Sequence, residues 1–363
     1  MQKAAEHLLG LTIGDGWKVT KKHDSTEYQF RTGGVYSCCY EVRRNENGKE
    51  TIGFLKAIDY SNVSQVSDVD PAERMQDMLN AYQYEKKILT ICLERGLNNV
   101  VRLVESGGFE VDAVPKYPKV EYLILEHADL GDVRKVMSTH AVDFEWKVRS
   151  IHQIAKALSQ LHGIGVAHQD VKPSNVVNFN LSSTKLADLG SACSKNPIQE
   201  SLPKHLDDRY SGSFEYSPPE LLYGHLSGIF EERRFLCDLY LLGNMVIFYF
   251  ANMSMNSLLK SKLDRNLWWE RPEMYGKFEY VKPYLIDAFE KALIDFRDSI
   301  EDDEYRDDLE TIVRYLCNPD PSRRGHAKNL NQRYNQYGLA RFLTLLDRIA
   351  KKIKYKSSHG TNI

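Results

Sequence analysis

The chain has 363 residues, of which 42% are hydrophobic and 27% charged, a composition typical of a globular protein with a sizeable core. Its formal net charge of −2 predicts no nucleic-acid partner, because neutralising a phosphate backbone requires a basic surface. The six cysteines form no Cys-x-x-Cys pair and no apolar leader precedes them, so we expect free thiols and a cytoplasmic location.

The first third of the chain is predicted to form a small sheet with one helix. Asn47-Gly48 is a strong signal for a two-residue hairpin turn. Asp70 before Pro71 is typical of a helix start, and we expect this helix to extend to about Glu94. Aromatic and β-branched residues predict strands at residues 28–42, 51–58, 100–109 and 120–125.

From residue 131 onward the pattern becomes helical. The most apolar stretch, residues 236–250, contains Asp238 and is too short to span a bilayer comfortably, so we predict a buried core helix and no transmembrane segment. Another helix is indicated by apolar residues at three- and four-residue spacing. They are Ile151, Ile154, Ala155, Leu158 and Leu161.

Residues 168–175, with the sequence His-Gln-Asp-Val-Lys-Pro-Ser-Asn, are the most informative stretch of the chain. Asp188-Leu189-Gly190 begins 18 residues after Asp170. These two stretches bring together a general base, a phosphate-facing cation and two oxygen ligands of the kind that magnesium prefers. Phosphoryl transfer from a nucleotide requires this set of groups.

The two stretches closely resemble the catalytic loop and metal-binding motif of eukaryotic-like (Hanks-type) serine/threonine protein kinases. The resemblance implies an α+β, bilobal protein-kinase fold with a five-stranded antiparallel sheet and one helix in the N-lobe. We expect the N-lobe at residues 1–127, including a leader at residues 1–16. The mainly helical C-lobe then follows at residues 128–363, with a C-terminal helix and a basic tail.

The same resemblance implies how the chain would use ATP and Mg²⁺ to phosphorylate protein substrates. Asp170 would accept the hydroxyl proton, and Lys172 would balance charge on the γ-phosphate. Asn175 and Asp188 would hold the metal ion. Lys172 also matches the serine/threonine pattern, as does Ser213, at a position where such kinases carry a hydroxyl residue.

Further nucleotide contacts are implied in the predicted N-lobe and at the connector between the lobes. Lys56 would contact the α- and β-phosphates and pair with Glu85. The backbone of Glu126 to Ala128 would bind adenine, behind which Leu125 closes the pocket. Asp132 has two interpretations, a ribose contact or a charge at a helix N-terminus that the helix dipole stabilises.

Two features depart from the family pattern near the predicted nucleotide. The glycine-rich loop is poor, since Gly33 and Gly34 supply its backbone amides and Cys39 stands at the motif's valine. Phe54 replaces a small residue, so it would either stack on the base or crowd the pocket. These departures support the alternative of a pseudokinase that acts as a binding or scaffold protein.

The segment at residues 188–220 resembles an activation segment, and we predict autophosphorylation on its serines. Gln169 replaces an arginine that commonly pairs with a phosphate there, so we predict activity independent of such phosphorylation. Glu220 is predicted to pair with Arg324, and Asp238 to support the catalytic loop. These features argue against a third reading, a small-molecule kinase of related fold.

The C-terminal segment carries an apolar helix face ahead of a basic stretch. Packing on the helical lobe and contact with a partner or an anionic membrane surface are both open interpretations. The basic residues are Lys351, Lys352, Lys354 and Lys356.

Overall fold

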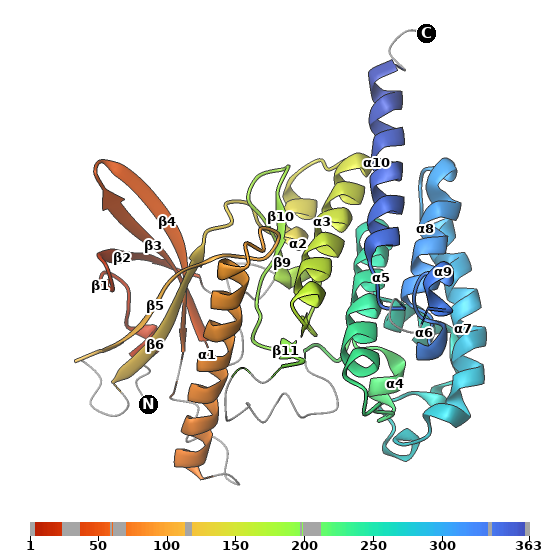
Figure 1. Ribbon diagram of the computed structural model, residues 1–363, viewed down its shortest axis with the longest axis horizontal. Coiled ribbons are helices and arrows are strands. Elements are labelled where there is room, and N and C mark those ends of the chain that lie inside the picture. Colours follow the sequence, from red (N-terminus) through yellow and green to blue (C-terminus); the bar gives the residue numbers. More distant parts are fainter. Residues whose placement is uncertain are drawn as a thin grey trace.

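The computed structural model describes residues 4–23, 37–58, 60, 70–112, 118–196, 198, 212–332 and 336–359. A strand-rich lobe with one long helix lies beside a mainly helical lobe (Figure 1). The strands are β1 (Thr12–Ile13), β2 (Trp17–Lys22), β3 (Ser37–Glu46), β4 (Lys49–Ile58), β5 (Leu103–Glu110), β6 (Lys119–Glu126), β7 (Gly131–Asp132), β8 (Val166–Ala167), β9 (Val176–Asn178), β10 (Thr184–Leu186) and β11 (Cys193–Ser194).

The α-helices are α1 (Pro71–Glu94), α2 (Val133–Thr139), α3 (Phe144–Gly163), α4 (Pro219–Leu222), α5 (Leu236–Ala251), α6 (Met255–Lys262), α7 (Phe278–Asp298), α8 (Asp303–Leu316), α9 (Ala327–Leu330) and α10 (Ala340–His359). The short 3₁₀ helices are η1 (Ala4–Glu6), η3 (Pro173–Asn175), η6 (Arg265–Leu267), η7 (Pro272–Met274) and η8 (Pro321–Arg323), and η5 (Glu231–Phe235) is a single π-helical turn.

The N-lobe sheet is antiparallel and has the strand order β1-β2-β3-β4-β6-β5. Within the described residues this sheet has six strands, one more than the five predicted. Both β1 and β2 precede the first predicted strand range, and β1, at the sheet edge, has only two residues, too few for a recognisable sequence pattern. The predicted hairpin is confirmed, since Asn47 and Gly48 have φ values of 52° and 79° between Glu46 and Lys49.

Successive side chains along each strand point to opposite sides of the sheet, so the sheet has two different faces. On one face, Tyr40, Leu55 and Ile124 are buried in an outer core that also contains Leu8 and Trp17. The opposite face turns toward α1 and the helical lobe. On this face β3, β4 and β6 present Cys39, Phe54, Lys56, Leu123 and Leu125, as the cross-strand pairing shows.

Helix α1 begins as predicted, because the Asp70 side chain accepts a hydrogen bond from the Ala72 backbone N–H at 3.0 Å and Pro71 occupies the first turn. Its inner side buries Tyr82, Glu85 and Ile88, among others. Apolar packing against the sheet thereby carries one carboxylate into the protein interior.

The helical lobe is built around α5, most of whose residues are buried, as predicted for a core helix. Among the described residues, one helix has the length and composition to cross a membrane, Glu231–Ala251, and 89% of its apolar window is buried in the protein. The apolar face predicted on α3 packs in the same core, with Ile151, Ile154 and Leu158 fully buried.

Helix α10 crosses the outside of this lobe beside α3 and α8, and its last turns project beyond the body (Figure 1). Phe342, Leu346 and Ile349 are buried, so packing on the helical lobe is observed. The basic residues follow along the same helix, where Lys351 pairs with Asp347 at 2.6 Å and Lys356 pairs with Glu304 on α8.

Candidate active site

The catalytic loop predicted from the sequence is anchored on the core helix α5. The fully buried Asp238 carboxylate accepts hydrogen bonds from the backbone N–H groups of His168 and Gln169, both at 2.8 Å. It also contacts His162 Nε2 at 2.8 Å. The predicted supporting role of Asp238 is therefore observed. The rigid centre of the C-lobe fixes the backbone immediately before Asp170.

Asp170 lies at the centre of a compact hydrogen-bond network. Its Oδ2 accepts from Lys172 Nζ at 2.8 Å and from Asn175 Nδ2 at 2.9 Å, and its Oδ1 accepts from the Ser213 backbone N–H at 2.9 Å. Burial raises the pKa of Asp170 above its ordinary value, although Lys172 opposes the shift. The carboxylate is thus oriented from three sides and held close to a cation.

The approach of Ser213 to Asp170 depends on Gly212. This glycine has a φ of 91°, and a Cβ there would lie 2.5 Å from the Gln169 carbonyl oxygen and 2.7 Å from Asp170 Oδ1. Only a residue without a side chain fits between the two segments. The later part of the predicted activation segment therefore packs directly on the catalytic loop.

Lys56 joins the two lobes. Its Nζ lies 2.9 Å from both carboxylate oxygens of Glu85 on α1 and 3.0 Å from Asp188 Oδ1. Burial lowers the Lys56 pKa, but Asp188 and Glu85 outweigh it and raise the pKa above the ordinary value. The Lys56 ammonium in turn lowers the pKa of Asp188 to about 2. Lys56 and Asp188 are therefore both charged at neutral pH.

Asn175 and Asp188 carry the oxygen atoms predicted to hold a metal ion. The Asn175 side-chain N–H groups donate to the Asp170 backbone carbonyl and to the Asp170 side chain, both at 2.9 Å. The acceptor oxygen of Asn175, Oδ1, therefore points away from Asp170. Asp188, two residues before Gly190, adopts a φ of 62°. A hard oxygen donor set of this kind fits Mg²⁺, which takes one or two protein ligands and completes its shell with phosphate and water.

The predicted nucleotide contacts above this centre lie on one face of the sheet. Cys39, Phe54, Lys56 and Leu125 share the face by register, and burial raises the Cys39 thiol pKa to about 12, so the thiol is protonated. Phe54 is partly buried against the main core. The predicted glycines Gly33 and Gly34 lie outside the described residues.

The connector between the lobes is held by charge. Glu126 Oε1 accepts from Lys185 Nζ at 2.6 Å and from the Arg102 backbone N–H at 2.8 Å. The Ala128 carbonyl accepts from the Gly131 N–H at 3.0 Å and closes a turn before α2. The connector is thus tied to both lobes, and Lys185, which sequence reasoning missed, contributes through a contact across 59 residues.

Asp132 takes the second of its two predicted interpretations. Its carboxylate caps α2 by accepting from the Arg134 and Lys135 backbone N–H groups, and it pairs with the Arg134 side chain at 2.7 Å. The side chain is buried and already has partners on its own helix. Asp132 therefore caps α2, and its contact with a ribose stays a prediction.

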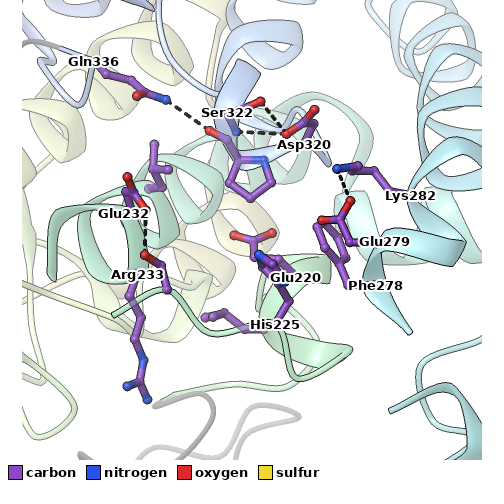
Figure 2. A pocket seen from close by; sticks show the side chains of 14 residues that line it. Glu220, His225, Glu232, Arg233, Phe278, Glu279, Lys282, Asp320, Ser322 and Gln336 are labelled. Atoms are coloured by element: carbon purple, nitrogen blue, oxygen red, sulfur yellow. Dashed lines mark hydrogen bonds and ion pairs between the residues drawn. The ribbon is translucent and has the colours of Figure 1, made fainter. Parts of the chain in front are cut away.

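The segment after Ser213 is fixed by the predicted ion pair. Arg324 donates to the two carboxylate oxygens of Glu220 at 2.6 and 2.8 Å, and both residues are buried. Glu220 also lines a cavity of about 330 Å³ between α4, α7 and η8, together with Glu232, Glu279 and Asp320 (Figure 2). None of the predicted catalytic or nucleotide-binding residues that the structure describes lines this cavity.

Gln169 makes contacts that the sequence did not predict. Its side-chain Nε2 donates to the Arg234 carbonyl at 2.8 Å and to Asp238 Oδ1 at 3.1 Å, and its Oε1 accepts from Arg234 Nη1 at 3.2 Å. The residue is buried and has a φ of 67°. The glutamine that replaces an arginine thus holds the loop against the turn η5.

A model of the protein kinase domain family matches residues 33–334 of the chain. The chain is 30% identical over 180 residues to Serine/threonine-protein kinase PKH2 of Saccharomyces cerevisiae, covering 45% of this chain and 16% of that protein. It is 28% identical over 189 residues to Extracellular signal-regulated kinase 2 of Dictyostelium discoideum, covering 51% of this chain and 48% of that protein. The chain thus spans less than half the length of these curated relatives.

Proposed function

Since this chain belongs to the protein kinase family, we propose that it transfers the γ-phosphate of ATP to serine or threonine hydroxyls of protein substrates. The observation that carries the proposal is the joint placement of Lys56, Glu85 and Asp188 across the lobes, above an oriented Asp170. A scaffold protein would not require these three groups to meet, because bringing charges such as the buried Glu85 and the largely buried Lys56 out of water costs several kcal/mol per ion unless they are paired.

Phosphoryl transfer requires the protein to position the reacting groups and to neutralise the charge of the phosphates. Asp170 Oδ1 and Oδ2 are fixed by Ser213 and Asn175, so the carboxylate can accept the proton of a substrate hydroxyl and direct its oxygen. Lys172, 2.8 Å from Asp170, supplies positive charge where the transferred phosphoryl group would pass. Lys56 can hold the phosphate chain because Glu85 fixes its ammonium group.

Asn175 and Asp188 would hold Mg²⁺ in this proposal. The bound metal would neutralise charge on the phosphates as the transfer proceeds. Asp188 carries its negative charge throughout the neutral pH range, as a metal ligand must, because Lys56 lowers its pKa.

Serine/threonine specificity is the finer part of the proposal. Lys172 and Ser213 support it, since both lie beside Asp170. Among the relatives, the Saccharomyces cerevisiae protein is itself named a serine/threonine-protein kinase. We include autophosphorylation and a cytoplasmic location in the proposal, the latter supported by six free cysteines.

The test is to incubate the purified protein with Mg²⁺, γ-labelled ATP and a generic basic protein, beside Asp170→Ala and Lys56→Ala variants. Phosphoserine or phosphothreonine that disappears in both variants is the expected result. No labelling in the wild type, together with no rise in melting temperature on adding ATP, would favour the pseudokinase reading. Labelled phosphotyrosine would refute the serine/threonine assignment but leave the kinase assignment intact.

A further inference from the structure

Two neighbouring residues of α1 make contacts in different parts of the molecule. Glu85 is buried and pairs with Lys56 on the N-lobe sheet. Tyr84 is also buried, and its hydroxyl oxygen accepts a hydrogen bond from the backbone N–H of Ser194 at 3.0 Å, across 110 residues of the chain. Tyr84 thus connects the long helix of the N-lobe to strand β11 of the C-lobe.

The backbone N–H of Ser194 lies on the free edge of a two-stranded sheet. Strand β11 pairs antiparallel with β8 alone, and Ser194 stands opposite Val166. The Lys195 N–H donates to the Gly165 carbonyl at 2.8 Å, so the N–H of the preceding residue points away from β8. An N–H group on a strand edge requires a partner, and the Tyr84 hydroxyl provides one in place of a third strand.

The strand that receives Tyr84 belongs to the framework of the catalytic loop. Strand β8 leads directly into His168 and Gln169, whose backbone N–H groups are held by the buried Asp238 on the core helix α5. The position of β11 is therefore fixed relative to Asp170. Through one hydroxyl group, Tyr84 ties α1 to the same framework that orients the proposed base.

The turn between Asp188 and β11 lies against the next residue of α1. A Cβ added to Gly190 would lie 3.6 Å from Glu85 Oε2 and 3.4 Å from Asp188 Oδ1, so the Glu85 carboxylate lies beside this turn. Asp188 in turn contacts Lys56 Nζ at 3.0 Å. Tyr84 and Glu85 therefore contact the two ends of one short segment, which begins at a proposed metal ligand and ends in β11.

We propose that Tyr84 is a positioning residue for phosphoryl transfer: its hydroxyl fixes α1 on β11, and Glu85 thereby holds the Lys56 ammonium beside Asp188, where the phosphates of the nucleotide would bind. This inference rests on the proposed use of ATP. Burial raises the pKa of Tyr84 to about 12, so the hydroxyl is neutral at physiological pH. Tyr84→Phe therefore removes a hydrogen bond but no charge, and it keeps a ring in the main core.

The experiment measures steady-state kinetics of the full chain and of Tyr84→Phe with Mg²⁺, ATP and a generic basic protein. One hydrogen bond changes an equilibrium by about two- to tenfold, so kcat/KM for ATP should fall by about that factor. A partial loss is expected because Lys87, one turn further along α1, also donates to the Ile198 carbonyl at 3.1 Å. KM for the protein substrate should not change. Wild-type kcat/KM for ATP in Tyr84→Phe would overturn the inference.

A double-mutant cycle separates positioning through Glu85 from an independent effect. In a Glu85→Gln background, Tyr84→Phe should change kcat/KM for ATP by less than about twofold, because the group through which Tyr84 acts has already lost its charge. If the losses of the two single variants multiply in the double variant, Tyr84 does not act through Glu85 and the inference is wrong.

A matched control is Tyr249→Phe. Tyr249 is buried on α5, away from α1, and its hydroxyl forms a hydrogen bond with the Ser150 hydroxyl. Loss of this hydroxyl should lower the melting temperature about as much as Tyr84→Phe does, but kcat/KM for ATP should keep its wild-type value. An equal kinetic loss in the control would show that activity follows overall stability, which would contradict a positioning role for Tyr84.

A measurement on the wild type alone guards against variants that fail to fold. The backbone N–H of Ser194 should exchange slowly with deuterium in the free protein, because the buried Tyr84 hydroxyl protects it on an otherwise open strand edge. Exchange at the rate of an unprotected amide would refute the inference and leave the kinase proposal standing. A wild-type protein that neither binds ATP nor transfers phosphate would refute both.

Discussion

The buried pair of Glu220 and Arg324 allows a prediction whose size can be worked out from the structure. Arg324 is fully buried and donates to both Glu220 oxygens, to the Leu236 carbonyl at 3.2 Å and to the Asn318 carbonyl at 2.9 Å. Removing one charge leaves the other uncompensated in the interior, which costs about 3–5 kcal/mol. Glu220→Leu and Arg324→Met should each destabilise the protein by this amount.

The double variant should be more stable than either single variant, because it leaves no buried charge without a partner. The double variant should still be about 1–3 kcal/mol less stable than the wild type, because the carbonyls that lose Arg324 as donor are left without a hydrogen bond. An unfolding entropy of ~2.1 cal/mol/K per residue gives about 0.8 kcal/mol/K for 363 residues, so each single variant should melt about 4–6 °C lower.

The assay is thermal unfolding of the wild type, both single variants and the double variant in one buffer, followed by circular dichroism. The double variant should melt between the wild type and the single variants. If the losses of the two single variants simply add in the double variant, the two side chains act independently. The reasoning about a coupled buried pair would then be wrong.

Three further predictions concern the catalytic loop. Burial raises the pKa of Asp170, so kcat should fall on acidification at a pH above the ordinary aspartate range. Lys172 opposes this rise in pKa, so Lys172→Ala should move the acid limb of the pH–rate profile to higher pH. Because Gln169 replaces an arginine, phosphatase-treated protein should keep its activity in the labelling assay, and loss of turnover would contradict this. Asp238→Asn places an amide beside the backbone donors of His168 and Gln169, so kcat should fall about 10²-fold through misplacement of Asp170.

The parts of the site that could be predicted from the sequence are those encoded by short, contiguous stretches. Asp170, Lys172 and Asn175 lie within six residues, and their types match one chemistry, so their mutual contacts follow from the loop itself. The start of α1 was predictable for the same reason, since Asp70 and Pro71 act within one helical turn. Local rules suffice where the partners are close in sequence.

Other parts of the site depend on contacts between distant residues, which leave no periodic signal. Lys185 and Arg234 reach the connector and the catalytic loop across 59 and 65 residues, respectively. Tertiary packing determines which distant side chains come into contact, and a single sequence does not show this packing directly.

The two halves of the proposed site are fixed to different degrees. Asp170 is tied through Gln169 and Asp238 to a core helix, and these groups have fully buried partners. Lys56 reaches the same centre from the other lobe through its ion pairs with Glu85 on α1 and with Asp188. A small rotation of α1 would break the first contact without disturbing the catalytic loop. Control of this kinase should therefore act on the position of α1, whereas the base remains assembled throughout.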